Sequence, residues 1–380
     1  MKVTIFQFEK LSGYDTYIFD FAKVLTESGH SVTVVTSNQM PLIGNARALS
    51  KKGIIDRLCG SRWIELNFLR FFPSLYSFYF LRKLLEFSDV VYVKNEVLDL
   101  IPILLAKRHV NISIICGIHT PLHYFNWNSL RANIHNIVYS STFYRSMLSA
   151  CDLIHVLNVD DKDFLKNVFH IEKSKIRMVP LWIDHEKFKL QEKSFSKSFR
   201  ILFIGRLDMR KGIDILLKSI VQIAKIFHDK FSKMSFTIVG KGPFENQIRE
   251  IQERYGNVKY LKFVTDNIVL YKEHDILVLP SRAETFSYVT LEALTCGLPV
   301  IASDIPGPRS LIENGKTGIL VPVGNSSALS KAILSMYELW TSKDEYNRIG
   351  NYCRQSVLKR FPPESTKKAF VNLIESIGKR

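Results

Sequence analysis

The sequence predicts an α/β protein made of two doubly wound domains, each with a parallel sheet covered by helices on both faces. Short apolar runs alternate with helical patterns along both halves of the chain, as expected for βαβ units. A polar and charged stretch over 184–199 interrupts this alternation, and 380 residues are more than one core usually accommodates. We expect domains at 1–190 and 198–360, with a C-terminal helix within 361–380 that packs back on the N-terminal domain.

In the first half, six apolar runs have the length and composition of buried strands. They are residues 3–8, 31–36, 90–93, 112–116, 153–157 and 176–179. The run at 3–8 is too short for the apolar region of a signal peptide, and Glu9 and Lys10 close it. We therefore expect it to form the first buried strand.

In the second half the alternation restarts with six further strand candidates. They are residues 200–204, 235–239, 258–263, 276–279, 300–303 and 318–321. Helical patterns at 212–227 and 243–255 lie between some of them. The last segment begins at Pro362 and has a helical pattern after Glu364.

One stretch, 63–87, is rich in aromatic and aliphatic residues. Arg70, Pro73 and Arg82 are among the residues that interrupt it, so it holds no uninterrupted membrane-spanning helix, which needs about 20 residues. Two interpretations stay open. The stretch forms either an interfacial helix on an anionic membrane or a core helix packed under a sheet.

The chain is strongly basic, with a formal net charge of +16. Such a surplus favours polyanions, which include nucleic acid, anionic lipid head groups and phosphorylated substrates, and no nucleic-acid-binding motif accompanies it. The five cysteines are scattered and never spaced C-x-x-C, which disfavours a metal cage or a disulfide framework. A reducing cytoplasm is the expected compartment.

The most informative feature is a pair of carboxylates, Glu284 and Glu292. Glu284 lies in a polar loop that follows the apolar run 276–279, and Glu292 lies in the first turns of a helix predicted over 288–295 and ended by Gly297. In open parallel sheets, ligands bind beyond the carboxyl ends of the strands. Two acids beside a helix N-terminus suit a ligand that carries both hydroxyls and an anionic group.

A second cluster is the loop from Gly205 to Gly212, which follows the run 200–204 and supplies Arg206 and Lys211. Two cations beside the start of a helix could hold a diphosphate, because positive side chains and backbone amides then act at one point. A solvated charged loop is the alternative, and the loop alone does not decide between them.

Two weaker signals lie in the first half. Gly13 sits in a loop before a helical pattern, where backbone could approach a phosphate, but a single glycine is not the G-x-G-x-x-G pattern of nicotinamide-dinucleotide sites. His119 follows the run 112–116 and is expected at the carboxyl end of a strand. A surface or capped-loop histidine is the alternative. The sequence contains no paired metal-ligand spacing and no Walker-type loop.

Taken together, these clusters resemble the family 4 retaining glycosyltransferases (glycosyl transferases group 1). These sugar-nucleotide-dependent enzymes have the GT-B architecture, two Rossmann-like doubly wound domains that face each other across a cleft. The matching segments are Gly205-Arg206-Leu207 with Lys211-Gly212, Gly240-Lys241-Gly242-Pro243, the E-x7-E signature from Glu284 to Glu292, Cys296-Gly297-Leu298-Pro299, and Asn314-Gly315.

The resemblance implies a role for each candidate residue. Glu284 would orient the donor sugar through its hydroxyls, and Glu292 would hold the ribose of the nucleotide. Arg206 and Lys211 would neutralise the departing diphosphate in place of a metal, so neither a metal nor a cofactor is expected. His119 would lie beside the sugar and Gly13 near the diphosphate. The remaining implied donor-binding residues are Gly205, Phe286 and Ser287.

The implied activity is hexosyl transfer from a nucleotide-diphosphate sugar to a glycan or lipid-linked acceptor, with retention of configuration. The C-terminal domain would bind the nucleotide sugar and the N-terminal domain the acceptor. The implied location is cytoplasmic, peripheral at the inner face of the cell membrane. A catalytically silent scaffold that binds glycans or nucleotides, and a phosphorylase or epimerase of the same architecture, are the alternatives.

The sequence also departs from the family pattern. Thr285 and Ser287 stand where glycine is usual, Pro306-Gly307 replaces a Gly-Gly pair, and Ser310 replaces a common glutamate. These departures leave the identity of the donor sugar open.

Overall fold

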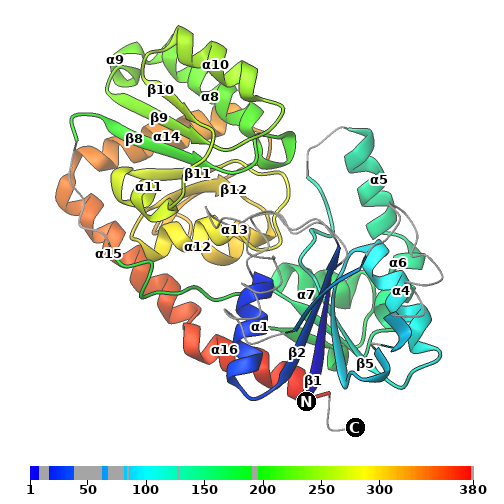
Figure 1. The fold of residues 1–380 in the computed structure, drawn as a ribbon. Coiled ribbons are helices and arrows are strands. Elements are labelled where there is room, and N and C mark those ends of the chain that lie inside the picture. The colour runs from blue at the N-terminus through cyan, green and yellow to red at the C-terminus, as the bar shows by residue number, and fades with distance from the viewer. Residues whose placement is uncertain are drawn as a thin grey trace. The chain divides into compact units, whose positions relative to one another are not determined.

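The protein is described here by a computed structural model. It describes residues 1–7, 17–37, 62–66, 81–83, 85–125, 129–190 and 196–377, with only the backbone at 7, 36–37 and 62–66. The chain forms two compact units (Figure 1). The first unit contains Met1–Leu122, Ile137–Leu181 and Glu364–Arg380, and the second unit contains His123–Asn136 and Trp182–Pro363.

The first unit is built on a seven-stranded sheet whose strands all run parallel. Its strands are β1 (Lys2–Gln7), β2 (Ser31–Ser37), β3 (Arg62–Leu66), β4 (Val90–Lys94), β5 (Ser113–Gly117), β6 (Leu153–Val156) and β7 (Ile176–Met178). The order across the sheet is β3-β2-β1-β4-β5-β6-β7. The six strands predicted in this half agree with the structure to within one residue at every described end.

Strand β3 was not predicted. The stretch 63–87 was expected to be helical, but its first residues extend the sheet instead, with Thr33 of β2 opposite Arg62. Trp63 and Ile64 are residue types that favour strands, and the free edge of β2 offers them backbone partners. Further along, 81–83 and 85–86 are helical, and Leu81 and Leu85 are buried in the core. Most of the rest of this stretch lies outside the described residues.

Helices follow most strands of the first unit and cover its sheet. They are α1 (Tyr17–Glu27), α4 (Val97–Lys107), α6 (Thr142–Ser149) and α7 (Val159–Asn167), joined by α16 (Pro363–Glu375) near the end of the chain. Helix α5 (Leu130–Tyr139) precedes α6, and its residues up to Asn136 are assigned to the second unit. Ser141 and Asn158 cap α6 and α7 through their side-chain oxygens. Phe370 of α16 stacks on Phe21 of α1 at 3.9 Å between ring centroids, which ties α16 into the core of this unit.

The second unit is built on a six-stranded parallel sheet. Its strands are β8 (Phe199–Ile204), β9 (Met234–Val239), β10 (Val258–Leu261), β11 (Ile276–Leu279), β12 (Val300–Ser303) and β13 (Gly318–Val321). All six were predicted, with β10 two residues shorter than expected. The order is β10-β9-β8-β11-β12-β13, the strand order of Rossmann-type dinucleotide-binding sheets.

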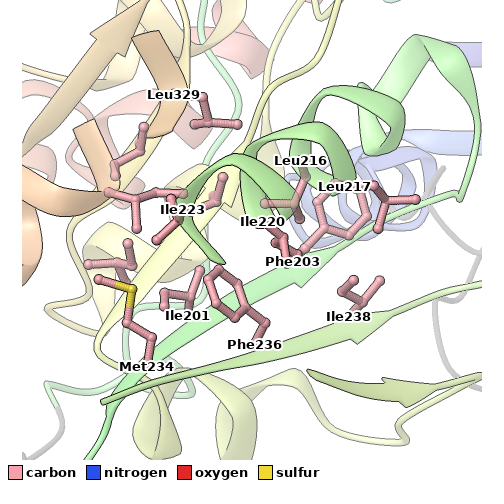
Figure 2. Packing of buried hydrophobic residues seen from close by; sticks show 14 of the residues in the cluster. Ile201, Phe203, Leu216, Leu217, Ile220, Ile223, Met234, Phe236, Ile238 and Leu329 are labelled. Atoms are coloured by element: carbon pink, nitrogen blue, oxygen red, sulfur yellow. The ribbon is translucent and has the colours of Figure 1, made fainter. Parts of the chain in front are cut away.

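The helices of the second unit include two that the sequence predicts nearly to the residue, α8 (Ile213–Ile226) and α10 (Glu245–Arg254). The others are α9 (His228–Phe231), α11 (Asn267–Glu273), α12 (Tyr288–Thr295), α13 (Pro306–Leu311), α14 (Ser326–Thr341) and α15 (Lys343–Arg360). Leu216, Ile220 and Ile223 lie on one face of α8 and pack on Phe203 and Phe236 of β8 and β9 (Figure 2). Burial of each such side chain stabilises the fold by roughly 1.5–3 kcal/mol.

The prediction of two doubly wound parallel sheets is thus confirmed. In each sheet the connections change direction at a central pair of strands, β1 with β4 and β8 with β11. Such switch points leave a crevice beyond the carboxyl ends of the two strands. Among the described helices, none is both long and apolar enough to cross a membrane.

Candidate active site

The candidate residues of the second unit gather at its switch point. Strand β8 leads into Gly205, and the neighbouring strand β11 leads through Pro280 to Glu284. Parallel pairing brings the carboxyl ends of the two strands to the same edge of the sheet. The loop after β8 and the loop after β11 are therefore neighbours, although they are distant in sequence.

Lys211 and Glu284 contact each other directly across this switch point. The Lys211 Nζ lies 2.5 Å from Glu284 Oε1, and Ser281 Oγ donates to the same carboxylate oxygen at 3.0 Å. Both charged side chains are largely buried, with 17% of Lys211 and 12% of Glu284 exposed. The two sequence clusters that carried the functional prediction thus meet at one point.

The loop after β8 is shaped by a short helical turn and a glycine. Residues Met209–Lys211 form a 3₁₀ turn capped by Asp208, whose carboxylate accepts from the backbone amide of Lys211 at 3.0 Å. Gly212 then takes a φ of +69°, and a Cβ at this position would collide with the Pro280 carbonyl oxygen. Only glycine fits this approach of the two loops.

Arg206 is less enclosed than Lys211. Its guanidinium bonds the Asp208 carboxylate through Nε at 2.9 Å and also through Nη2, and 45% of its side chain is exposed. Burial alone would raise the pKa of Asp208, but hydrogen bonds from Arg206 and Lys211 and the charge of Arg210 bring it below its ordinary value. Asp208 is therefore ionised at neutral pH and holds Arg206 at the loop.

Arg282 is a structural residue of the site that the sequence reasoning missed. Its guanidinium makes a bidentate pair with Asp214, with contacts of 2.7 and 2.8 Å, and donates to the Met209 carbonyl at 2.6 Å. Its backbone amide donates to the Arg210 carbonyl at 2.7 Å. Arg282 thereby joins the loop of Glu284 to the turn of Lys211, and no local sequence signal announces such a long-range pair.

Arg210 is a second residue that was missed. Its Nε is buried without a hydrogen-bond partner. Burial alone would lower the pKa of Arg210, but the charge of Glu284 and a hydrogen bond to Tyr124 outweigh it and raise the pKa. Tyr124 belongs to the segment His123–Asn136, which is part of the second unit, and Phe125 N donates to the Arg282 carbonyl at 3.1 Å.

Helix α12 has the bounds that the sequence predicts, and Gly297 after it has a φ of +77°. The Ser287 side chain caps its N-terminus by accepting from Thr290 N at 3.4 Å and from Thr290 Oγ1 at 2.9 Å. Phe286 is nearly buried, with its ring edge-on to Tyr288 and Phe361. The hydroxyl at position 287, where the resemblance implies a glycine, thus caps the helix.

Glu292 lies within α12, where the Tyr271 hydroxyl donates to its Oε2 at 2.5 Å. Burial raises the pKa of the Glu292 carboxyl, while hydrogen bonds from Tyr271 and Asn267 and the charge of Lys187 oppose the rise. Glu284 and Glu292 therefore have different partners, a lysine for the first and a tyrosine for the second.

Gly307 of α13 lies directly against the backbone of Glu284. Its amide donates to the Glu284 carbonyl oxygen at 3.1 Å. A Cβ at position 307 would lie 2.9 Å from both the Cβ and the carbonyl oxygen of Glu284. Of the Gly-Gly pair expected at 306–307, only Gly307 is a glycine, and it is the residue that lets α13 approach the loop of Glu284.

In the first unit, Gly13 lies outside the described residues. His119 follows β5, and its backbone amide donates to Asn95 Oδ1 at 2.9 Å. Its Nε2 lies 2.7 Å from the Tyr92 hydroxyl, and the Tyr17 ring stacks on it at 4.2 Å between centroids. Burial, His155 and Lys94 lower the pKa of His119 well below its ordinary value, so the imidazole is neutral at physiological pH.

The structure thus brings Gly205, Arg206, Lys211 and Glu284 to one edge of the second sheet, with Phe286, Ser287 and Glu292 on the segment that follows. Within the described part of the chain, no group of three or more acidic, histidine or cysteine side chains could hold a metal ion. Lys211 and Arg210 place positive charge beside Glu284, which suits an anionic ligand.

Comparison with known proteins places the chain in a family. The family described as glycosyl transferases group 1 matches residues 184–356, and the glycosyltransferase family 4 matches residues 11–187. The protein belongs to the family 4 glycosyltransferases. The resemblance drawn from the Gly205–Gly212 loop and the E-x7-E signature is therefore confirmed.

Two relatives and one solved structure illustrate the match. A glycosyltransferase of Methanocaldococcus jannaschii is 27% identical over 63% of this chain and 62% of its own length. An Escherichia coli enzyme, UDP-Gal:alpha-D-GlcNAc-diphosphoundecaprenol alpha-1,3-galactosyltransferase, is 24% identical over 92% of this chain and 90% of its own. Sucrose-phosphate synthase from Thermosynechococcus elongatus superposes with a TM-score of 0.77 at 19% identity, covering 99% and 98% of the two chains. The fold is GT-B.

Proposed function

We propose that this family 4 glycosyltransferase transfers a hexose from a nucleotide-diphosphate sugar to a glycan or lipid-linked acceptor, with retention of configuration. The observation that carries the proposal is the contact between Lys211 and Glu284 at the switch point of the second sheet. A cation and a carboxylate at one point match a donor whose diphosphate is anionic and whose sugar carries hydroxyls.

The chemistry of the reaction needs such an arrangement. Glycosyl transfer develops negative charge on the departing diphosphate while positive charge develops at the sugar. Lys211 and Arg206, fixed before the reaction begins, would stabilise the leaving group more in the transition state than in the ground state. Glu284 would orient the sugar through its hydroxyls, and Glu292 would accept hydrogen bonds from the ribose.

The names of the relatives support the donor and acceptor classes. The Escherichia coli relative, which matches over 92% of this chain, is named for a UDP-linked donor sugar and a diphosphoundecaprenol acceptor. We infer from this a nucleotide sugar as donor and a glycan or lipid-linked sugar as acceptor. Retention would appear in the anomeric configuration of the product, which NMR of the purified glycoside measures directly.

The central experiment screens nucleotide sugars for donor hydrolysis and transfer. With the preferred donor, Lys211→Ala and Glu284→Ala should lower turnover about 10²–10³-fold, the usual effect of removing one group that stabilises a transition state. Lys218→Ala, on the exposed face of α8, is the matched control and should keep wild-type turnover. A folded Glu284→Ala protein with full activity would overturn the proposal.

The same screen separates the alternatives. Calorimetric binding of nucleoside diphosphates without turnover under any acceptor would favour the silent scaffold. Release of a sugar phosphate when inorganic phosphate replaces the acceptor would favour a phosphorylase, and a changed sugar on the recovered nucleotide would favour an epimerase.

We also propose that no metal assists the leaving group, because Lys211, Arg206 and Arg210 supply positive charge at the loop. Turnover should then persist in excess EDTA. Loss of activity in EDTA, restored by a divalent cation, would contradict this.

Peripheral association with an anionic membrane is a further proposal. The net charge of +16 favours it, and Leu98, Ile101 and Leu105 form an exposed apolar row on α4, with exposed Arg108 close by. Flotation with anionic and with neutral vesicles tests it. We expect salt-sensitive binding to the anionic vesicles alone, and no binding to either kind would end the proposal.

A further inference from the structure

Behind His119 lies a chain of hydrogen bonds that the donor-site chemistry does not use. The His155 Nε2 lies 2.6 Å from the Val179 carbonyl oxygen, and the His155 Nδ1 lies 2.7 Å from the Tyr92 hydroxyl. The same hydroxyl lies 2.7 Å from the His119 Nε2. All four residues belong to the first unit.

The direction of each hydrogen bond follows from its neighbour. A carbonyl oxygen only accepts, so the His155 Nε2 carries a proton. Burial lowers the pKa of His155 to about 4, so this ring is neutral and its Nδ1 accepts from the Tyr92 hydroxyl. Tyr92 has then used its only proton, and its oxygen can only accept from the His119 Nε2. His119 is therefore protonated at Nε2 and carries its lone pair at Nδ1.

The reverse direction would need a proton on both nitrogens of His155. That imidazolium would stand in a buried ring of aromatic side chains, with Phe370 at 5.9 Å and Tyr92 at 5.9 Å between centroids. Burial disfavours the charged form. The aromatic surroundings thus fix the polarity of the whole chain of hydrogen bonds.

Gly117 shows how closely the chain is enclosed. A Cβ at this position would collide with the Tyr92 hydroxyl and would lie 2.8 Å from the His119 Nε2. The Tyr17 ring lies parallel to the imidazole on one face. Lys94 acts electrostatically on the His119 ring and disfavours a second positive charge there.

We propose that Tyr92 and His155 are positioning residues that hold His119 in the Nε2–H tautomer, in which Nδ1 can accept a hydrogen bond from a substrate hydroxyl but cannot donate one. The part that concerns the substrate rests on the proposed function. His119 then acts neither as a general acid nor as a fixed cation. In this tautomer Nδ1 favours a hydroxyl over a carbonyl or a phosphate oxygen as its hydrogen-bond partner.

The tautomer is tested by long-range ¹H–¹⁵N NMR on the full chain labelled at histidine, at neutral pH. His119→Gln and His155→Gln assign the two sets of signals. We expect the Nε2–H pattern for both rings in the wild-type protein. In Tyr92→Phe, His155 should keep this pattern because Val179 still fixes it, whereas His119 should show a mixture of tautomers.

Two variants keep the test decisive. Tyr346→Phe removes an equally buried hydroxyl in the second unit, one that bonds the Asp275 carbonyl, and should leave the His119 signals unchanged. If Tyr92→Phe does not fold, Gly117→Ala displaces the same hydroxyl without deleting it. An Nδ1–H or doubly protonated His119 in the wild-type protein, or an unchanged His119 pattern in a folded Tyr92→Phe variant, would overturn the proposal.

Kinetics gives the second measurement. We expect Tyr92→Phe to lower kcat/KM for transfer roughly tenfold to a hundredfold, by analogy with the loss of a residue that orients a metal-binding histidine, while Tyr346→Phe keeps it. If Tyr92→Phe shows a mixture of His119 tautomers but keeps the wild-type kcat/KM, His119 does not bind substrate through Nδ1. If the wild-type protein transfers no sugar at all, the proposed function fails while the NMR result still decides the tautomer.

Discussion

Lys211 and Glu284 lie 2.5 Å apart at their charged atoms, although 73 positions separate them in the chain. The cation expected to meet the diphosphate is held by the carboxylate expected to meet the sugar. A bound donor would therefore replace this contact, because Lys211 would pair with the diphosphate and Glu284 with the sugar hydroxyls. The ion pair keeps both side chains in place and keeps the charge of each compensated.

The ion pair should be measurable as a coupling. Removal of either partner leaves a largely buried charge behind, so Lys211→Ala and Glu284→Ala should each lower the free energy of unfolding by about 1–3 kcal/mol. The double variant should lose less than the sum of the two, with a coupling of roughly 0.5–3 kcal/mol. Denaturant unfolding of the four proteins without nucleotide measures it. Strict additivity would show that the two side chains do not interact in solution.

Gly307→Ala should disturb the position of Glu284. The new methyl group would meet the Glu284 backbone and Cβ at 2.9 Å, closer than ordinary contacts, and misplacement of a binding group by about 1 Å can lower activity about 10²-fold. Gly256→Ala, whose Cβ would meet nothing within 4 Å, is the control. Measuring turnover and melting temperature of both variants separates a loss of activity from a loss of stability. Equal turnover in the two variants would contradict the assigned role of Gly307.

Arg282→Lys should be strongly destabilising although it preserves the charge. Lysine cannot reproduce the bidentate contact with Asp214 or reach the Met209 carbonyl in the same geometry. Breaking a buried pair typically costs about 3–5 kcal/mol, which chemical denaturation would detect. Arg309→Lys, which alters a more exposed pair with Asp304, should change stability by less than about 1 kcal/mol.

Nucleotide binding should depend on the protonation of Glu292. Burial raises the pKa of this carboxyl. The neutral acid therefore favours the folded state, and this contribution to stability is lost as the pH rises through the pKa. The carboxylate formed above the pKa is the form that accepts hydrogen bonds from both ribose hydroxyls. Tyr271→Phe removes a hydrogen bond that lowers the pKa and should move the acid limit of nucleoside diphosphate binding to higher pH. Calorimetry between about pH 5 and 8 measures the affinity for a nucleoside diphosphate, with Tyr346→Phe as control. Identical pH profiles of the wild-type and Tyr271→Phe proteins would contradict the prediction.

Acid should destabilise the first unit through His155. Burial lowers the pKa of His155 from 6.5 to about 4, so the stability it contributes is complete above pH 6.5 and is lost as the pH falls toward 4. The difference corresponds to about 3 kcal/mol. His155→Gln should flatten the pH dependence of unfolding over this window. A variant whose stability falls as steeply as that of the wild-type protein would contradict the prediction.

Much of the fold could be predicted because buried parallel strands are continuous apolar runs. The runs at 276–279, 300–303 and 318–321 became β11, β12 and β13 without a change of bounds. Helix α12 was equally clear, since Gly297 ends it with a positive φ. Strand β3 was missed because an edge strand is specified by its neighbour's backbone more than by its own pattern.

The site could be predicted only in part. Lys211 and Glu284 stood out because each follows a strand in a recognisable motif. Arg282 and Tyr92 did not, since their importance comes from partners far along the chain, Asp214 for one and His119 for the other. Sequence periodicity carries no information on such pairs. The amino-acid composition likewise did not predict that His123–Asn136 belongs to the second unit.

Phe370 has a consequence for how this protein is made. Its ring stacks on Phe21 and meets Tyr92 edge-on at 5.8 Å, so α1 and β4 gain this partner only after Phe370, much further along the chain, has been synthesised. Domains usually mature on the ribosome in the order of their synthesis. Because the first unit includes residues after the second unit, we expect its core to be completed after the second unit has been synthesised.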